Sequence, residues 1–200
     1  GAGYGLMALA LVLVFSVTRV IFIPQGEFVA FGALSMAVLH AGRVPATLWL
    51  LLALAVIVLV VEAWRWKRGA AVDWTSAIVW CVALPVLAAV LVLGVKPESL
   101  AAQAATTLVL ITPLGPLMYR LAFRPLADAT VLTLLIVSVA LHGVLVGMGL
   151  LFFGAEGSRT PAFSDARFDL GGLQVSGQSL VVQGVTLLLA ESLFFFFAYT

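Results

Sequence analysis

Charged residues are scarce in this sequence. Only 10% of its 200 residues are Asp, Glu, Lys or Arg, whereas 64% are hydrophobic. An average soluble domain carries charge on about 25% of its residues, so this surface would not dissolve in water. The ten basic and nine acidic side chains leave a formal net charge of +1. Nucleic-acid-binding proteins typically have a much larger excess of basic residues. The composition predicts a membrane protein whose surroundings are a lipid bilayer, with no nucleic acid as a partner.

Cysteine and histidine are also rare, since the chain has one cysteine, Cys81, and two histidines, His40 and His142. A single cysteine excludes an intrachain disulfide framework and a metal site built from several thiolates. The sequence contains no Gly-x-Ser-x-Gly, His-Glu-x-x-His or Gly-x-x-x-x-Gly-Lys motif. We therefore expect no catalytic residues, no metal and no cofactor here. Any coupled ATP hydrolysis would take place on a separate subunit.

Long apolar runs occupy most of the chain. A hydrocarbon core about 30 Å thick is crossed by about 20 helical residues, and the helix satisfies its own backbone groups where water is absent. The runs lie at Tyr4–Ile23, Phe28–Leu39, Ala46–Ala63, Trp74–Val95, Leu100–Met118, Ala129–Phe153 and Ser179–Ala198. They predict an all-α, polytopic transmembrane helix bundle of about seven spans, or six if the short second run is re-entrant. We expect one transmembrane domain over residues 1–200.

Some segments are expected to depart from regular helix. Pro85 lies within the fourth run and should kink it, and Pro113 and Pro116 should make the last turns of the fifth run irregular. Alternating apolar and polar residues among glycines over Asp165–Ser176 indicate a small hairpin outside the membrane.

Basic residues beside the spans predict the orientation of the chain. Cytoplasmic loops are enriched in Lys and Arg, and such residues follow the third run (Arg65, Lys67, Arg68) and the fifth (Arg120, Arg124). Counting spans outward from these loops places the amino terminus and the loop at residues 154–178 on the extracytoplasmic side. Interfacial aromatic residues fall at the same ends of the runs, at Trp64, Trp66, Trp74 and Tyr119.

Glu27 is a candidate for lining a transport pathway. It ends a predicted break at Pro24-Gln25-Gly26-Glu27 between two apolar runs, where a broken helix would expose backbone groups and a new helix amino terminus. The alternative is an ordinary turn with Glu27 as an acid in the first helical turn. Arg19 could pair with Glu27, or could extend to the lipid headgroups.

Three further polar residues lie in the later runs. His142 could line a pathway or could be a neutral histidine bonded across a helix interface. Beside it, Gly143 and Gly147 form a small-residue face suited to close helix packing. Gln183 and Glu191 are eight residues apart on one face of the last run, and could face a water-filled interior, although Glu191 could be merely interfacial.

Three separated segments resemble the branched-chain amino acid ABC transporter permeases of the LivH type. The first contains the apolar opening from Gly3 to Phe15, followed by Pro24-Gln25-Gly26-Glu27-Phe28. The second is Tyr119-Arg120-Leu121-Ala122-Phe123-Arg124-Pro125-Leu126, which is similar to a cytoplasmic Arg-x-x-x-Arg-Pro-Leu segment of that family. The third is Gly157-Ser158-Arg159, between two spans.

This resemblance implies a permease subunit in a bacterial plasma (inner) membrane that transports branched-chain or other hydrophobic amino acids, or related amides. The implied partners are a second permease subunit, expected to be a paralogue, cytoplasmic ATPase subunits and a periplasmic substrate-binding protein. Gln25, Gly26, Glu27, His142, Gln183 and Glu191 would contribute to the pathway, and Arg120, Arg124 and Pro125 to the cytoplasmic face. A complete permease of this type would continue beyond Thr200.

Two other functions fit the same residues. The chain could be a non-transporting scaffold or assembly subunit, in which polar side chains only hold helices together. An intramembrane enzyme is less well supported, because paired catalytic groups are missing from the sequence.

Overall fold

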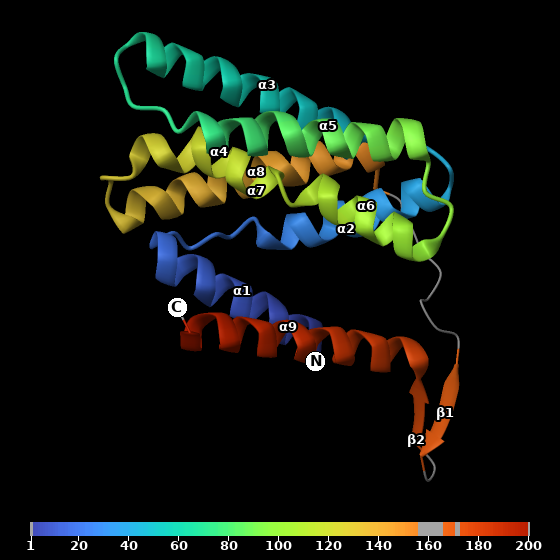
Figure 1. The fold of residues 1–200 in the computed structure, drawn as a ribbon. Coiled ribbons are helices and arrows are strands. Elements are labelled where there is room, and N and C mark those ends of the chain that lie inside the picture. The colour runs from blue at the N-terminus through green and yellow to red at the C-terminus, as the bar shows by residue number, and fades with distance from the viewer. Residues whose placement is uncertain (1, 156–165, 171–172, 200) are drawn as a thin grey trace. The chain divides into compact units, whose positions relative to one another are not determined.

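The computed structural model describes residues 2–155, 166–170 and 173–199. The chain forms two compact units: the first comprises Gly1–Arg19 with Pro161–Thr200, and the second comprises Val20–Thr160. Figure 1 shows both units as mainly helical. The expectation of one transmembrane domain over the whole chain stays a prediction.

The first unit pairs the two ends of the chain. Helix α1 (Ala2–Thr18) packs against α9 (Gly177–Tyr199). Strands β1 (Arg167–Leu170) and β2 (Leu173–Ser176) form an antiparallel pair, in which Phe168 lies opposite Val175. This pair confirms the hairpin that alternation predicts within Asp165–Ser176.

The second unit is a bundle of helices. It contains α2 (Gln25–His40), α3 (Ala46–Lys67), α4 (Trp74–Ile78), α5 (Leu84–Ala89), α6 (Leu100–Ile111), α7 (Leu114–Met118) and α8 (Val131–Phe153). Shorter turns continue some of these helices: η1 (Val79–Ala83), η2 (Val90–Val95) and η3 (Tyr119–Phe123) are π-helical, and η4 (Arg124–Leu126) is 3₁₀. Helix α3 contacts α2, α5, α6, α7 and α8, so it is the central element of the bundle.

Four helical segments of the described chain are long and apolar enough to cross a membrane, namely Ala46–Lys67, Trp74–Val95, Leu100–Leu126 and Val131–Phe153. They coincide with four of the predicted runs, so the expectation of a helical membrane protein is supported. The third helix continues past the predicted end at Ala63 to Lys67, and the sixth begins at Val131. The expected total of seven spans stays a prediction.

The bundle buries one side of each helix and exposes apolar side chains on the other. Leu48 and Leu51 of α3 are fully buried, as is Leu110 of α6. On the outer faces, Val60 of α3 is 63% exposed and Leu151 of α8 is 83% exposed. Helices that are apolar on all sides have this distribution when lipid, and not water, surrounds them.

Prolines account for the irregular turns in two helices. A proline within a helix cannot donate its backbone hydrogen bond and its ring crowds the preceding turn. The turn before Pro85 widens into the π-helical segment η1, and α6 ends at Ile111, two residues before Pro113. The predicted irregularity near Pro113 and Pro116 is thus confirmed, and at Pro85 the departure is a widened turn.

A buried hydroxyl pair joins α2 to α3. Ser35 and Thr47 are both fully buried, and their oxygens lie 2.6 Å apart. Thr47→Val keeps the shape of the side chain but leaves the Ser35 hydroxyl without this partner. We expect a loss of about 0.6 to 1.7 kcal/mol in unfolding free energy, the range measured for hydrogen bonds between membrane helices. Denaturation in mixed micelles measures it.

Thr186→Val is the matched control, because the Thr186 hydroxyl donates to the Val182 carbonyl of its own helix. If Thr47→Val and Thr186→Val lost the same unfolding free energy, the hydrogen bond between α2 and α3 would stabilise the protein no more than one within a single helix.

Candidate functional site

The break between the first two apolar runs lies slightly earlier than the sequence predicts. Helix α1 ends at Thr18 and α2 begins at Gln25, so the non-helical segment covers residues 19–24. Gln25, Gly26 and Glu27 therefore form the first turn of α2 and are not part of the break. The prediction that these three residues lie in the break was wrong, and the alternative, Glu27 as an acid in the first helical turn, is confirmed. The helix begins this early because the Pro24 carbonyl accepts the N–H of Glu27 at 3.0 Å.

Ser138 of α8 accepts a hydrogen bond from the break. The backbone N–H of Ile23 is shared between the Ser138 hydroxyl at 2.9 Å and the Ile21 carbonyl at 3.0 Å, and Ser138 is fully buried. The next residue, Pro24, is also buried and has no N–H to satisfy. The break can therefore pack inside an apolar bundle without an unpaired donor at these two positions.

One turn further along α8, His142 reaches Glu27. Nδ1 of His142 lies 2.9 Å from Oε1 of Glu27, and the side chains are 40% and 15% exposed. Ser138 and His142 are four residues apart, so they lie on the same face of α8. We call the four residues Ile23, Glu27, Ser138 and His142 the break site. His142 thus lies at the interface of α2 and α8, as one of its two alternatives expected, and a role in a pathway stays a prediction.

The break site has an unused acceptor. Oε2 of Glu27 is buried and has no hydrogen-bond partner among the described residues, and Nδ1 of His142 is not aligned for a hydrogen bond despite its short distance to Oε1. A buried carboxylate oxygen without a partner is costly. The site can therefore accept a hydrogen bond from a donor that enters it, such as an ammonium or amide group.

Aromatic rings surround the amino-terminal turn of α2. Phe22 packs edge-to-face on Phe28, with ring centroids 5.5 Å apart, and on Phe123 at 6.0 Å. Phe31, one turn along α2, is buried against Phe153. Aromatic contacts thus hold the break and the start of α2 against η3 and α8.

Other candidates lie elsewhere. Gln183 and Glu191 are exposed on α9, in the first unit, and their part in a pathway stays a prediction. Arg19, at the end of the first unit, has a left-handed backbone with φ of 57°, and its pairing with Glu27 stays a prediction. A side chain at Gly143 or Gly147 would meet no atom of the described residues within 4 Å, so close helix packing at these glycines stays a prediction; Gly149 lies against the Phe31 ring.

A second polar group, the arginine cluster, joins the carboxyl end of α3 to η3 and η4. It consists of Glu62, Ser76, Arg120 and Arg124. Glu62 is 1% exposed. Its Oε1 accepts hydrogen bonds from Nη1 of Arg120 at 3.2 Å and from Nη1 of Arg124 at 2.5 Å. Nη2 of Arg120 also donates to the Ser76 hydroxyl at 2.6 Å.

The arginine cluster brings the two basic segments of the sequence to one end of the second unit. Trp66 packs on Trp74 there, with centroids 6.0 Å apart, and the Arg68 guanidinium lies 3.7 Å above the Trp64 ring. A pocket of about 320 Å³ opens beside Arg120 and Arg124, between Trp80 and Tyr119. The contacts agree with the prediction that both basic segments face the same compartment. Pro125 is exposed in η4 and is not one of these contacts.

Glu62 and Ser138 are the residues that sequence reasoning missed. Glu62 lies within an apolar run, where a charge by itself indicates a function or a partner. Two arginines four residues apart, in a segment predicted on the same side of the membrane, could have identified its partner. Ser138 has no comparable signal, because serine is common in membrane helices.

Neither cluster forms a metal site. Among the residues that the structure describes, no group of three or more His, Cys, Asp or Glu side chains is placed to hold a metal ion. Both clusters instead pair an acid with a basic or hydroxyl group across a helix interface.

Replacing Glu62 should destabilise the second unit strongly. Glu62→Gln removes the charge that two arginines share, and breaking a buried ion pair on one side costs about 3 to 5 kcal/mol. We expect about 3 kcal/mol, because Arg124 keeps 29% of its side-chain surface exposed and can reach water. The unfolding free energy in micelles measures it.

Glu98→Gln is the matched control, because Glu98 is exposed and its carboxylate has no ion pair among the described residues. A change below about 1 kcal/mol in Glu62→Gln, the size of a surface ion pair, would contradict the arginine cluster as drawn.

Comparison of the chain with protein-family models, with curated proteins and with solved structures finds no match. The resemblance to LivH-type permeases therefore depends on the three sequence segments alone.

Proposed function

We propose that this chain is a transmembrane permease subunit of an ABC importer, and that the break site forms part of its translocation pathway. The observation that carries the proposal is the Glu27 carboxylate, which is 15% exposed, has one oxygen without a partner among the described residues, and meets His142 across two helices. A charge inside a membrane bundle is costly and is retained where it binds or moves something. The segments that resemble LivH-type permeases add the class of transporter.

The proposed substrates are branched-chain or other hydrophobic amino acids, or related amides. The free oxygen of Glu27 could accept a hydrogen bond from an ammonium or amide group of such a molecule. The rings of Phe22, Phe28 and Phe31 lie on the same stretch of chain and offer apolar contact to its side chain. An amphipathic substrate of this kind would meet both a charge and an apolar surface at the break site.

The proposed assembly follows from the permease class. Cytoplasmic ATPase subunits would hydrolyse ATP, since the sequence has no phosphate-binding loop. A second permease subunit, a paralogue, would complete the pathway in a bacterial inner membrane, and a periplasmic binding protein would deliver the substrate. Movement between inward-open and outward-open states would expose the break site to each side in turn.

Uptake should depend on the charge of Glu27. We expect Glu27→Gln to lower ATP-dependent uptake of radiolabelled leucine by about tenfold or more, which corresponds to about 1.4 kcal/mol of lost interaction. The measurement uses proteoliposomes that contain this chain with the ATPase and permease encoded beside its gene, and the binding protein outside.

Asp128→Asn is the matched control, because Asp128 is exposed in the turn before α8 and makes no ion pair among the described residues. Unchanged uptake in Glu27→Gln would remove Glu27 from the pathway. Neighbouring genes that encode neither an ATPase nor a binding protein would contradict the importer itself.

A non-transporting scaffold is the second candidate, and the internal polar contacts favour it. The arginine cluster, the Ser35–Thr47 pair and the bond from Ile23 to Ser138 all join one helix to another. In a scaffold, Glu27→Gln would lower the amount of folded protein and any associated flux in the same proportion. A loss of uptake at an unchanged amount of folded protein separates the permease from the scaffold.

A further inference from the structure

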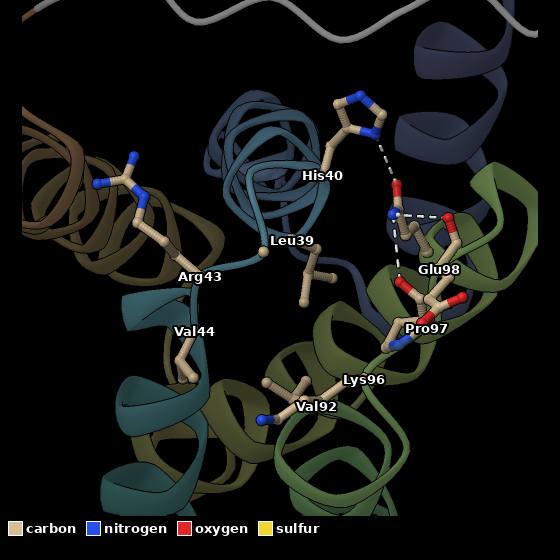
Figure 2. A pocket seen from close by; sticks show the side chains of 10 residues that line it. Leu39, His40, Arg43, Val44, Val92, Lys96, Pro97 and Glu98 are labelled. Atoms are coloured by element: carbon tan, nitrogen blue, oxygen red, sulfur yellow. Dashed lines mark hydrogen bonds between the residues drawn. The ribbon is translucent and has the colours of Figure 1, made fainter.

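A hollow lies at the end of the second unit opposite to the arginine cluster, since it adjoins the start of α3 and the arginine cluster contacts the end of α3. It has a volume of about 370 Å³, within the range of ligand-binding pockets. The end of α2, the start of α3, the end of η2 and the start of α6 surround it (Figure 2). Neither the break site nor the arginine cluster contributes a residue to it.

A buried glutamine fixes one wall of the hollow. Gln103 of α6 is 4% exposed, and its amide nitrogen donates to the carbonyls of Pro97 and Glu98 at 3.2 and 3.3 Å. Its amide oxygen lies 3.1 Å from Nδ1 of His40, at the end of α2. These three interactions, drawn as dashed lines in Figure 2, hold the loop between η2 and α6 against α2. The wall is therefore formed before any ligand arrives.

The lining combines an apolar floor with unpaired cations. Leu39, Val44 and Val92 provide the apolar side chains, and Figure 2 shows Lys96 extending beside Val92 while Arg43 points away from the hollow. Neither cation has a side-chain hydrogen bond or an ion pair among the described residues. With Glu98 as the one acid, the lining residues carry a formal charge of +1 when Arg43, whose side chain lies at the rim, is included.

Lys96 has a backbone conformation that lysine rarely adopts. Its φ is 51° and it ends η2, with its N–H donating to the Leu91 carbonyl at 3.1 Å. Helices that end in this left-handed conformation usually have glycine there, because other residues are strained. A strained residue suggests that its side chain serves a function at this position.

The position of the hollow indicates what fills it. Three helices of membrane-spanning length begin or end beside it, at Ala46, Val95 and Leu100, so it lies where lipid headgroups meet the hydrocarbon core. Val95 is 62% exposed and continues the face of Val92 along η2. An acyl chain could therefore run along η2 from a headgroup held in the hollow.

We propose that the hollow binds the headgroup of an anionic glycerophospholipid. Lys96 pairs with its phosphate, Arg43 adds attraction at the rim, and the Glu98 carboxylate and the exposed His40 accept hydrogen bonds from headgroup hydroxyls. A lining with a net charge of +1 complements a lipid with a net charge of −1. This proposal is independent of whether the chain transports anything.

Lys96→Gly tests the proposal without harming the fold. Glycine relieves the backbone strain at this position, so the variant should unfold at the same or a higher temperature. It also removes the cation, so we expect binding of phosphatidylglycerol to weaken about fivefold relative to phosphatidylcholine, the effect of about one lysine near a charged headgroup. Lipid titration of the detergent-purified protein, followed by native mass spectrometry, measures both affinities.

Lys67→Ala is the matched control, because Lys67 is a basic residue at the other end of α3. An equal loss in Lys67→Ala and Lys96→Gly would overturn the proposal, since general surface attraction would then explain the preference. Inorganic phosphate that competes as well as the lipid would also overturn it, in favour of a site for soluble anions. A loss confined to Lys96→Gly, with no competition from phosphate, would support it.

Discussion

In an apolar medium every backbone N–H needs a partner, and the break before α2 is where this requirement is most demanding. Residues 19–24 leave the helix, yet Pro24 in this segment is buried. The chain meets the requirement with a proline, which has no donor, and with two acceptors for the Ile23 N–H, the Ile21 carbonyl at 3.0 Å and the Ser138 hydroxyl at 2.9 Å. Because Ser138 belongs to α8, the second of these bonds joins the break to one face of α8. His142, one turn further along that face, is thereby placed beside Glu27.

The need for a partner in an apolar medium also explains why Glu27 and Glu62 are given different roles. Glu62 is 1% exposed and shares two arginines, so its charge is matched inside the bundle and its role is to hold η3 and η4 against α3. Glu27 meets a single imidazole and keeps one oxygen without a partner among the described residues. Oε2 of Glu62 also has no hydrogen-bond partner among the described residues, so the acids differ in their cations: two guanidinium groups hold Glu62, whereas Glu27, with a side chain 15% exposed, faces one imidazole. For this reason the proposed pathway includes Glu27, and Glu62 is assigned to the framework.

Much of the helical layout could be predicted from the sequence, because apolar runs of about 20 residues have few alternatives in a bilayer. The runs at Trp74–Val95 and near Val131–Phe153 coincide with helices of the structure, and the hairpin near Asp165–Ser176 is present within the described residues. The contacts could not be predicted in the same way. Glu62 meets arginines 58 and 62 residues away, and Ile23 meets Ser138 across 115 residues. Such pairs depend on how the helices pack, which the period of an apolar run does not specify.

The most direct test of this account is whether α2 and α8 meet at the break site in the membrane. Glu27→Cys and His142→Cys, combined in a Cys81→Ala background, provide two thiols for a short bifunctional thiol reagent added to intact membranes. The account predicts an intramolecular cross-link between these positions, seen as a linked peptide pair by mass spectrometry. If each cysteine reacts singly with the reagent but no linked pair forms, α2 and α8 do not face each other there, and the break site and the pathway built on it are contradicted.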